Sequence, residues 1–322
     1  MELRLVLVCL SLLCMSACRD SESISTEDPK STSAPATLDT TQTAATPTAT
    51  VKVLQYNVKQ GKSGQDCCWG NPSVRPKQQA LIVQELTSGG VELGSLIESD
   101  SGPAENWQCS DQDSLLGTHL PSFASHCTTC ATSSSFKEAT HLLWNQNKWT
   151  ALAKYGDASA DTCFAAGQTV FQGRGFAAVL LQSVDRPNDQ VIFIGVHPGH
   201  AAQGFYAGAG PVVVAYQELA GKSNGDPRLI ISGDFNLSCQ DALTQIGQSN
   251  IAPGTLVQCP SPPTCCYDSS FSLDYDHVFT NWPKAQLTTA IAPSYTGPFT
   301  PAGSGRHRSE EHKPVVATLQ LP

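Results

Sequence analysis

Short apolar segments that end at polar residues recur along the chain from residue 51 onward. Residues 51–56 alternate between apolar and polar side chains and end at Asn57, a pattern typical of a strand with one buried face. Residues 77–86 carry apolar side chains at helical spacing, and Gly89 and Gly90 end that segment. The same reasoning predicts strands at residues 91–97, 141–144, 177–181, 191–196, 229–231, 278–279 and 314–321, and the start of a helix at 212–219.

Many short strands with few helices predict one mixed domain over residues 51–322. A content of 40% hydrophobic residues is enough for a core of ordinary size. We therefore expect an α/β fold in which two packed sheets carry flanking helices. Residues 18–50 differ from this domain because they are rich in Ser, Thr, Ala and Pro and contain no aromatic residue, which predicts an extended tether.

The start of the chain has the features of an export signal. Residues 1–17 combine Arg4 with an apolar run that is shorter than the about 20 residues needed to span a bilayer, which predicts a signal peptide. Residues 15–18 also resemble a bacterial lipobox, in which Cys18 would be lipidated. We expect an outer-membrane or cell-surface lipoprotein that meets the membrane only through that lipid. The alternative is a periplasmic or secreted protein.

The cysteine content agrees with export. The chain has 13 cysteines, three of them within residues 1–18, and the remaining ten allow up to five disulfides in an oxidising compartment. The alternative is zinc, because Cys127 and Cys130 have ligand spacing and His126 and His141 lie nearby in the sequence. No second cysteine pair at matching spacing completes such a site.

The charge balance excludes one class of nucleic-acid binder. Lys and Arg total 19 against 28 Asp and Glu, so the chain has no basic arm that could coat a nucleic acid. An enzyme needs cations only near its site, so a nucleic-acid substrate remains open.

Polar residues capable of chemistry follow the predicted strands, where binding groups are usually mounted. Two histidines together with carboxylates and carboxamides suit the hydrolysis of a phosphate ester, which needs a hard cation, a base for water and donors for the developing charge. The residues concerned are Asn57, Glu98, His197, Asp234, Asn236, Asp276 and His312.

An ordered series of motifs resembles the metal-dependent endonuclease/exonuclease/phosphatase superfamily. The nearest local match is ISGDFN at residues 231–236. The others, in the order of the superfamily, are QYN at 55–57, GVELGSLIE at 90–98, Arg174 before a strand, IGVH at 194–197, YDHVF at 275–279 and EEHKPV at 310–315. The resemblance implies a two-sheet α/β sandwich of the deoxyribonuclease I type over residues 51–322.

The resemblance also implies roles for single residues. Glu98 would bind a divalent metal, usually Mg²⁺, with Mn²⁺ or Ca²⁺ as alternatives, and Asn57 would help to position the metal or the phosphate. Arg174 would contact the substrate. His197 would contact the scissile phosphate, either as a proton donor or as a stabiliser of its charge.

The remaining implied roles concern the attacking water. Asp234 and Asn236 would orient water and phosphate. His312 would be the second catalytic histidine, and Asp276 would fix its tautomer and raise its basicity, which suits a base near neutral pH. Which histidine acts as acid and which as base stays open.

Two positions complicate the match. Glu311 stands where the superfamily usually has Asp, and the extra methylene would either still reach the metal or displace it. Glu85 superficially resembles the first metal-binding carboxylate. We prefer Glu98, because it follows a strand whereas Glu85 lies inside a helical pattern.

The resemblance leaves the substrate open, because this fold hosts nucleases and lipid or inositol phosphatases alike. Export and the neighbourhood of Arg174 and His197 favour a monomeric nuclease, similar to secreted deoxyribonucleases and to the nuclease subunit of cytolethal distending toxins. Its substrate would be DNA outside the cell. The alternatives are a lipid phosphodiesterase of the sphingomyelinase kind and a non-catalytic surface lipoprotein.

Overall fold

A computed structural model of the 322-residue chain describes residues 49–59, 71, 73–99, 118–133, 136–156, 162, 174–199, 204–252, 254, 256, 261–266, 271–283, 285–299 and 311–321. All of them belong to a unit that spans Ala45–Pro322. The predicted signal peptide, the lipidated Cys18 and nearly all of the predicted tether lie outside the described residues. The first strand begins at Ala49, two residues before the predicted start of the domain.

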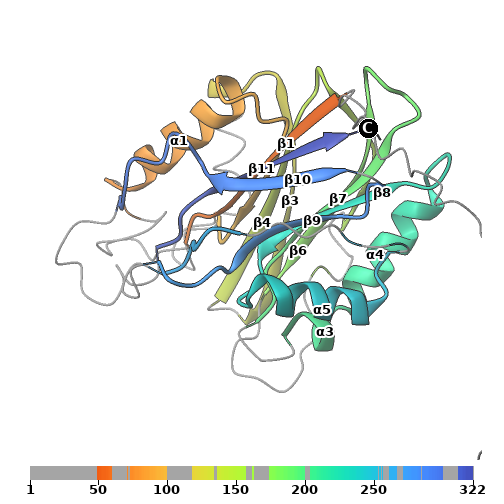
Figure 1. Ribbon diagram of the computed structural model, residues 1–322. Helices are drawn as coiled ribbons and strands as arrows, with labels where there is room; N and C mark the ends of the chain where they lie inside the picture. The colour runs from red at the N-terminus through yellow and green to blue at the C-terminus, as the bar shows by residue number, and fades with distance from the viewer. Residues whose placement is uncertain are drawn as a thin grey trace, which may run out of the picture. The chain divides into compact units, whose positions relative to one another are not determined.

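Two mixed sheets form the centre of this unit (Figure 1). The first contains β1 (Ala49–Asn57), β2 (Leu93–Ile97), β3 (Phe123–Ser133), β4 (Phe136–Asn145), β10 (Gln286–Ile291) and β11 (Val315–Leu321) in the order β10-β11-β1-β2-β4-β3. The second contains β5 (Trp149–Tyr155), β6 (Phe176–Ser183), β7 (Gln190–Val196), β8 (Arg228–Asp234) and β9 (Asp276–Thr280) in the order β5-β6-β7-β8-β9. This arrangement confirms the predicted two-sheet α/β fold.

Helices cover the outer faces of both sheets. The described helices are α1 (Arg75–Thr87), α3 (Gly204–Gly208), α4 (Gly210–Gly221) and α5 (Cys239–Ser249). Figure 1 shows α1 on the opposite side of the sheets from α3, α4 and α5. None of the described helices has the length and apolar character that crossing a bilayer requires.

Three apolar clusters join these layers. One lies between the sheets and includes Val53 and Leu93 from the first sheet and Phe193 from the second. A second packs the outer face of the second sheet against α4 and α5, and a third packs the first sheet against α1. Burial of this apolar surface is the main favourable contribution to the stability of such a sandwich.

Each sheet contains one parallel pair of neighbouring strands. β1 runs parallel to β2, and β7 runs parallel to β8, whereas the other neighbours are antiparallel. Parallel neighbours need a crossover connection, which α1 supplies in the first sheet and the α3–α4 segment in the second. Two strands of each sheet therefore end at one edge, and the residues after those ends are brought together.

Candidate active site

Four buried polar side chains from the parallel strand pairs meet at this edge. Asn57 ends β1, Glu98 follows β2, His197 follows β7 and Asp234 ends β8. The Asn57 Nδ2 atom donates hydrogen bonds to Asp234 Oδ2 at 2.9 Å and to Glu98 Oε1 at 3.2 Å. His197 Nε2 lies 3.5 Å from Asp234 Oδ2 and 3.7 Å from Glu98 Oε1. The predicted residues of both sheets thus form one cluster.

Two of the predicted site residues adopt an unusual backbone conformation. Glu98 has a φ of 52° and Asn236 a φ of 53°, in the left-handed region that residues other than glycine seldom adopt. Asn236 follows β8 closely, and its backbone N–H donates to Asp234 Oδ1 at 2.9 Å. Its side-chain Nδ2 donates to the Pro198 carbonyl at 3.0 Å, which connects the segments after β7 and β8.

Arg174 reaches the cluster through the pairing of β6 with β7. These strands are antiparallel, and the His197 N–H donates to the Gly175 carbonyl at 3.0 Å, so the start of β6 lies beside the end of β7. The Arg174 guanidinium contacts the His197 ring and lies 3.2 Å from Glu98 Oε1. Arg174 therefore joins the predicted site with its positive charge facing both residues.

Nearby positive charges lower two pKa values on this side of the site. Burial lowers the pKa of His197, and the positive charge of Arg174 lowers it further, to about 3. Burial raises the pKa of Glu98, but Lys59, Arg174 and His197 outweigh it and hold that pKa well below its usual range. At neutral pH, His197 is neutral and Glu98 is ionised.

His312 lies among carboxylates instead. Its Nδ1 is 2.8 Å from Asp276 Oδ2, and its Nε2 is 3.6 Å from Asp234 Oδ2. Burial lowers the pKa of His312, but Asp276 and Asp234 outweigh it and raise that pKa to about 9. The structure brings Asp276 and His312 into contact, and their catalytic roles stay predictions.

Sequence reasoning did not assign a role to several residues around Asp276. Gln55 Nε2 donates to Asp276 Oδ1 at 3.4 Å, and Ser232 Oγ donates to Gln55 Oε1 at 2.9 Å. Thr264 Oγ1 accepts the Asp276 N–H at 3.2 Å. The position of Gln55, two residues before Asn57 on the same face of β1, could have indicated its contact with the site. No comparable signal exists for Thr264.

Lys59 is a further residue that sequence reasoning missed. Its Nζ lies 3.7 Å from Glu98 Oε2, and it has a φ of 55° just beyond the end of β1. Together with Arg174 it places a second positive charge beside the Glu98 carboxylate. A lysine two residues after Asn57 could have been singled out as a cation near the predicted metal ligand.

The two uncertain glutamates contact the segment that follows β10. Glu311 is buried, and its Oε1 accepts the Phe299 N–H at 2.7 Å and the Tyr295 hydroxyl at 3.3 Å. Its metal-binding role stays a prediction. Glu85 accepts the Ser294 N–H at 2.9 Å and also its hydroxyl, while Glu98 contacts the cluster, in line with our preference for Glu98.

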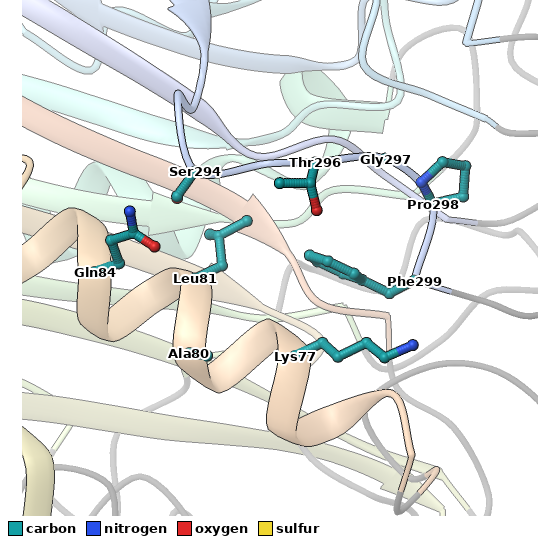
Figure 2. A pocket seen from close by; sticks show the side chains of 9 residues that line it. All are labelled: Lys77, Ala80, Leu81, Gln84, Ser294, Thr296, Gly297, Pro298 and Phe299. Carbon is teal, nitrogen blue, oxygen red and sulfur yellow. The ribbon is translucent and has the colours of Figure 1, made fainter.

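A cavity of about 400 Å³ lies between α1 and this same segment (Figure 2). Figure 2 shows that the lining side chains come from α1 and from the segment that carries Phe299, whose backbone N–H donates to Glu311. None of the predicted site residues lines it. The lining residues are Lys77, Ala80, Leu81, Gln84, Ser294, Thr296, Gly297, Pro298 and Phe299.

The zinc alternative gains no support from the described residues. The His126 ring hydrogen-bonds to the Tyr155 carbonyl, and the His141 ring hydrogen-bonds to Ser99 Oγ. Cys127 is disulfide-bonded, while the side chain of Cys130 lies outside the described residues. Elsewhere, Cys265 and Cys266 are bonded to each other. The prediction of up to five disulfides stays a prediction.

Solved structures share this fold although their sequences differ strongly. No family profile and no curated protein sequence matches the chain. An endonuclease/exonuclease/phosphatase family protein from Bacteroides thetaiotaomicron has 16% identity and a TM-score of 0.60, covering 85% of this chain and 98% of that chain. A mannosyl-6-phosphatase from the same species has 16% identity and a TM-score of 0.58, covering 84% of this chain and 99% of that one.

A human structure extends the comparison. The catalytic domain of human nocturnin with a bound sulfate anion has 13% identity and a TM-score of 0.54, with coverage of 85% of this chain and 95% of that chain. Sequence identities this low establish a shared fold. The chain therefore has the fold of the endonuclease/exonuclease/phosphatase proteins.

Proposed function

We propose that the chain is a metal-dependent phosphoester hydrolase. The observation that supports this most is the pair formed by His312 and Asp276, which lies within reach of Asp234 at the edge where the strands end. A histidine that is oriented by one carboxylate beside a second polar cluster is suited to taking a proton from water. The shared fold with a phosphatase agrees with this proposal.

The residues present fit a divalent cation. Glu98 and Asp234 offer carboxylate oxygens and are both held by Asn57, so their oxygen atoms converge. Asp234 and Asp276 bring further carboxylate oxygens within 4.8 Å of each other. Oxygen-rich sets of this kind suit Mg²⁺, with Mn²⁺ and Ca²⁺ as alternatives. When bound, the cation would supply charge stabilisation to the phosphate oxygens.

The side chains of this chain would then divide the reaction between them. Neutral His312 would take the proton of the attacking water at Nε2, because its Nδ1 is held by Asp276. A cation held by Asp234 would offset the carboxylate charge that raises the pKa of His312 to about 9 in the metal-free protein. Asp234 and Asn236 orient that water and the phosphate. Neutral His197 contacts the scissile phosphate, and Arg174 and Lys59 offer positive charge to its oxygens. Electrostatic contacts of this kind are the usual means of stabilising a phosphoryl transition state.

The proposed substrate is DNA outside the producing cell, cut internally by a monomeric, exported enzyme. The predicted signal peptide and lipid anchor support the location. The chain is acidic overall, with a net charge of −9 at pH 7, but a nuclease of this kind contacts few phosphates and needs cations only near the cut. Arg174 and Lys59 meet that requirement.

Nicking of supercoiled plasmid tests this proposal. The purified, oxidised chain without its predicted signal peptide would be assayed with Mg²⁺, with EDTA, and as the His312→Ala variant. We expect nicking that EDTA abolishes and that the variant loses. A folded protein that nicks no DNA would contradict the nuclease assignment, and failure on sphingomyelin and phosphate monoesters as well would contradict the hydrolase proposal itself.

A further inference from the structure

Two adjacent cysteines lie beside His312, and the proposed mechanism uses neither of them. Cys265 is 1% exposed, whereas Cys266 is partly exposed. Each offers one sulfur atom, and these atoms and one ring nitrogen of His312 all lie within 4.8 Å of one another. Three potential ligands of a soft metal therefore lie close together. One of them belongs to the side chain that is proposed to take the proton.

The backbone joins the cysteine pair to both members of the histidine–aspartate pair. Thr264 immediately precedes Cys265, and its carbonyl accepts the Lys313 N–H at 2.9 Å, one residue after His312. Its side-chain Oγ1 accepts the Asp276 N–H at 3.2 Å. Cys265 in turn exchanges backbone hydrogen bonds with Leu273, on the approach to β9. A conformational change at the cysteine pair would therefore be transmitted through these hydrogen bonds to the backbone at Asp276 and next to His312.

The ligand chemistry of this pair differs from that of the proposed catalytic cation. Glu98, Asp234 and Asn57 offer oxygen atoms, which suit Mg²⁺. Two thiolates and an imidazole nitrogen suit Zn²⁺ and related thiophilic cations. His312 is close to both groups, because its Nε2 lies 3.6 Å from Asp234 Oδ2 and one of its ring nitrogens lies within 4.8 Å of the two sulfur atoms.

The geometry points to a binding site for a thiophilic metal that is made of Cys265, Cys266 and His312. The disulfide between the two cysteines prevents metal binding, and its reduction permits it. A Zn²⁺ ion bound there occupies His312, so the water proton has no acceptor. The inhibitory effect rests on the proposed function, whereas the binding of zinc does not.

The opening step is a thiol–disulfide exchange with a dithiol reductant. A reductant thiolate attacks the more exposed Cys266 sulfur, the bond between the cysteines breaks, and Cys265 leaves as a thiolate that takes a proton. The second thiolate of the reductant then attacks the reductant sulfur in the mixed disulfide. Cys266 leaves as a thiolate and takes a proton to become a thiol. Two electrons pass to the protein and the reductant becomes a cyclic disulfide. Zinc binding then displaces the two thiol protons.

Metal binding to matched proteins tests the site without relying on activity. The full chain and the Cys265→Ser/Cys266→Ser variant would be treated with the dithiol, freed of it without oxygen, and titrated with Zn²⁺ against a chromophoric chelator. We expect the wild-type protein to bind one more Zn²⁺ than the variant. With Cd²⁺, we expect stronger thiolate-to-metal absorption in the wild type. Equal stoichiometry and equal absorption in the two proteins would overturn the site.

A second variant isolates the histidine. His312→Gln keeps both cysteines, and we expect its Zn²⁺ affinity at this site to fall by about tenfold or more, because an imidazole ligand is lost. An unchanged affinity would remove His312 from the site. Circular dichroism would establish that both variants fold, and the single Cys266→Ser change offers a milder replacement if the double variant does not.

Activity then separates the two proposals. We expect that a Zn²⁺ concentration that abolishes plasmid nicking by the reduced wild type leaves the nicking activity of the oxidised wild type and of the reduced double variant intact. Equal inhibition of all three would contradict control through the cysteine pair. If the chain binds the extra zinc yet hydrolyses no phosphoester, the proposed function fails and the metal site stands.

Discussion

His197 and His312 approach the same carboxylate oxygen, Asp234 Oδ2, at 3.5 and 3.6 Å, from the ends of different strands. The residues behind them carry opposite charges. Arg174 contacts His197, whose pKa falls to about 3, whereas Asp276 holds His312, whose pKa rises to about 9. Both rings are almost fully buried, so burial lowers the pKa of each and does not account for the difference.

This contrast shows how one residue type supplies two functions in one site. A histidine beside a guanidinium stays neutral and offers a hydrogen bond without changing its charge. A histidine bonded to a carboxylate can hold an added proton close to neutral pH. The neighbours therefore assign the proton-accepting role to His312 and the phosphate-contacting role to His197 in the proposed reaction. The open question of which histidine is the base becomes testable.

The largest expected effect comes from removing the proton acceptor. His312→Gln should lower turnover by at least about a hundredfold, in line with the loss of a general base. His277→Gln is the matched control, because His277 adjoins Asp276 but its ring hydrogen-bonds to Ser261 and to the Leu237 carbonyl. Steady-state assays on plasmid or a model diester would compare the two. Equal turnover of both variants would refute the role of His312.

A smaller effect should follow when the charge behind His312 is removed. Asp276→Asn keeps the shape of the side chain but takes away the first of the charges that raise the pKa of His312, so that pKa should fall from about 9. Turnover should drop by roughly tenfold, because the ring loses the partner that fixes its orientation and tautomer. Nuclear magnetic resonance titration of the metal-free protein would follow the ring. An unmoved pKa would show that Asp276 does not control it.

The two histidines should also affect stability in opposite pH ranges in the metal-free protein. The pKa of His312 lies above its unfolded value of 6.5, so its stabilising contribution is complete below pH 6.5 and disappears as the pH rises through about 9. The pKa of His197 lies below that value, so its contribution is complete above pH 6.5 and disappears as the pH falls toward about 3.

Denaturant unfolding in EDTA measures this difference. The difference in free energy of unfolding between the wild type and His312→Gln should decrease as the pH rises from 6.5 to 9. The corresponding difference between the wild type and His197→Gln should decrease as the pH falls from 6.5 to 3. Parallel curves for the two variants would mean that the contrast between the sites is absent in solution.

The smallest expected effect concerns Gln55 of the first sheet, which hydrogen-bonds to Ser232 and Asp276 of the second sheet. Gln55→Leu retains much of the volume but removes these hydrogen bonds, and turnover should fall by about threefold to tenfold, the equivalent of one hydrogen bond. The pH profile should move with it, since Asp276 would be less firmly held. A loss of stability with an unchanged pH profile would assign Gln55 a purely structural role.

Much of the fold could be predicted from apolar patterning where strands are buried along their whole length. β7 is buried at every position and was predicted within one residue. β5 and β10 escaped prediction because only a few of their positions are buried, so neither shows a continuous apolar run. α5 was also missed, although Ser238 Oγ accepts the Asp241 N–H as a helix cap should.

The members of the site could be predicted, but not their partners. The sequence analysis could select Asn57, Glu98, His197 and Asp234 because each of them comes at or just after the end of an apolar run that predicts a strand. The contact of Arg174 with His197 depends on the register of two antiparallel strands, and that of Gln55 with Asp276 joins opposite sheets. Neither register nor sheet packing is contained in local spacing, so the electrostatic contrast needed the structure.

The pairing of β1 with β11 makes the first described strand and the last one neighbours in the sheet. Asn57 closes the first of these strands, and His312 lies just before the second. Both residues therefore exist together only after translation has passed His312, and a nascent chain that is shorter lacks the proposed proton acceptor. In the proposed nuclease, a nascent chain that ends before His312, and a product of premature termination before that residue, would both be inactive.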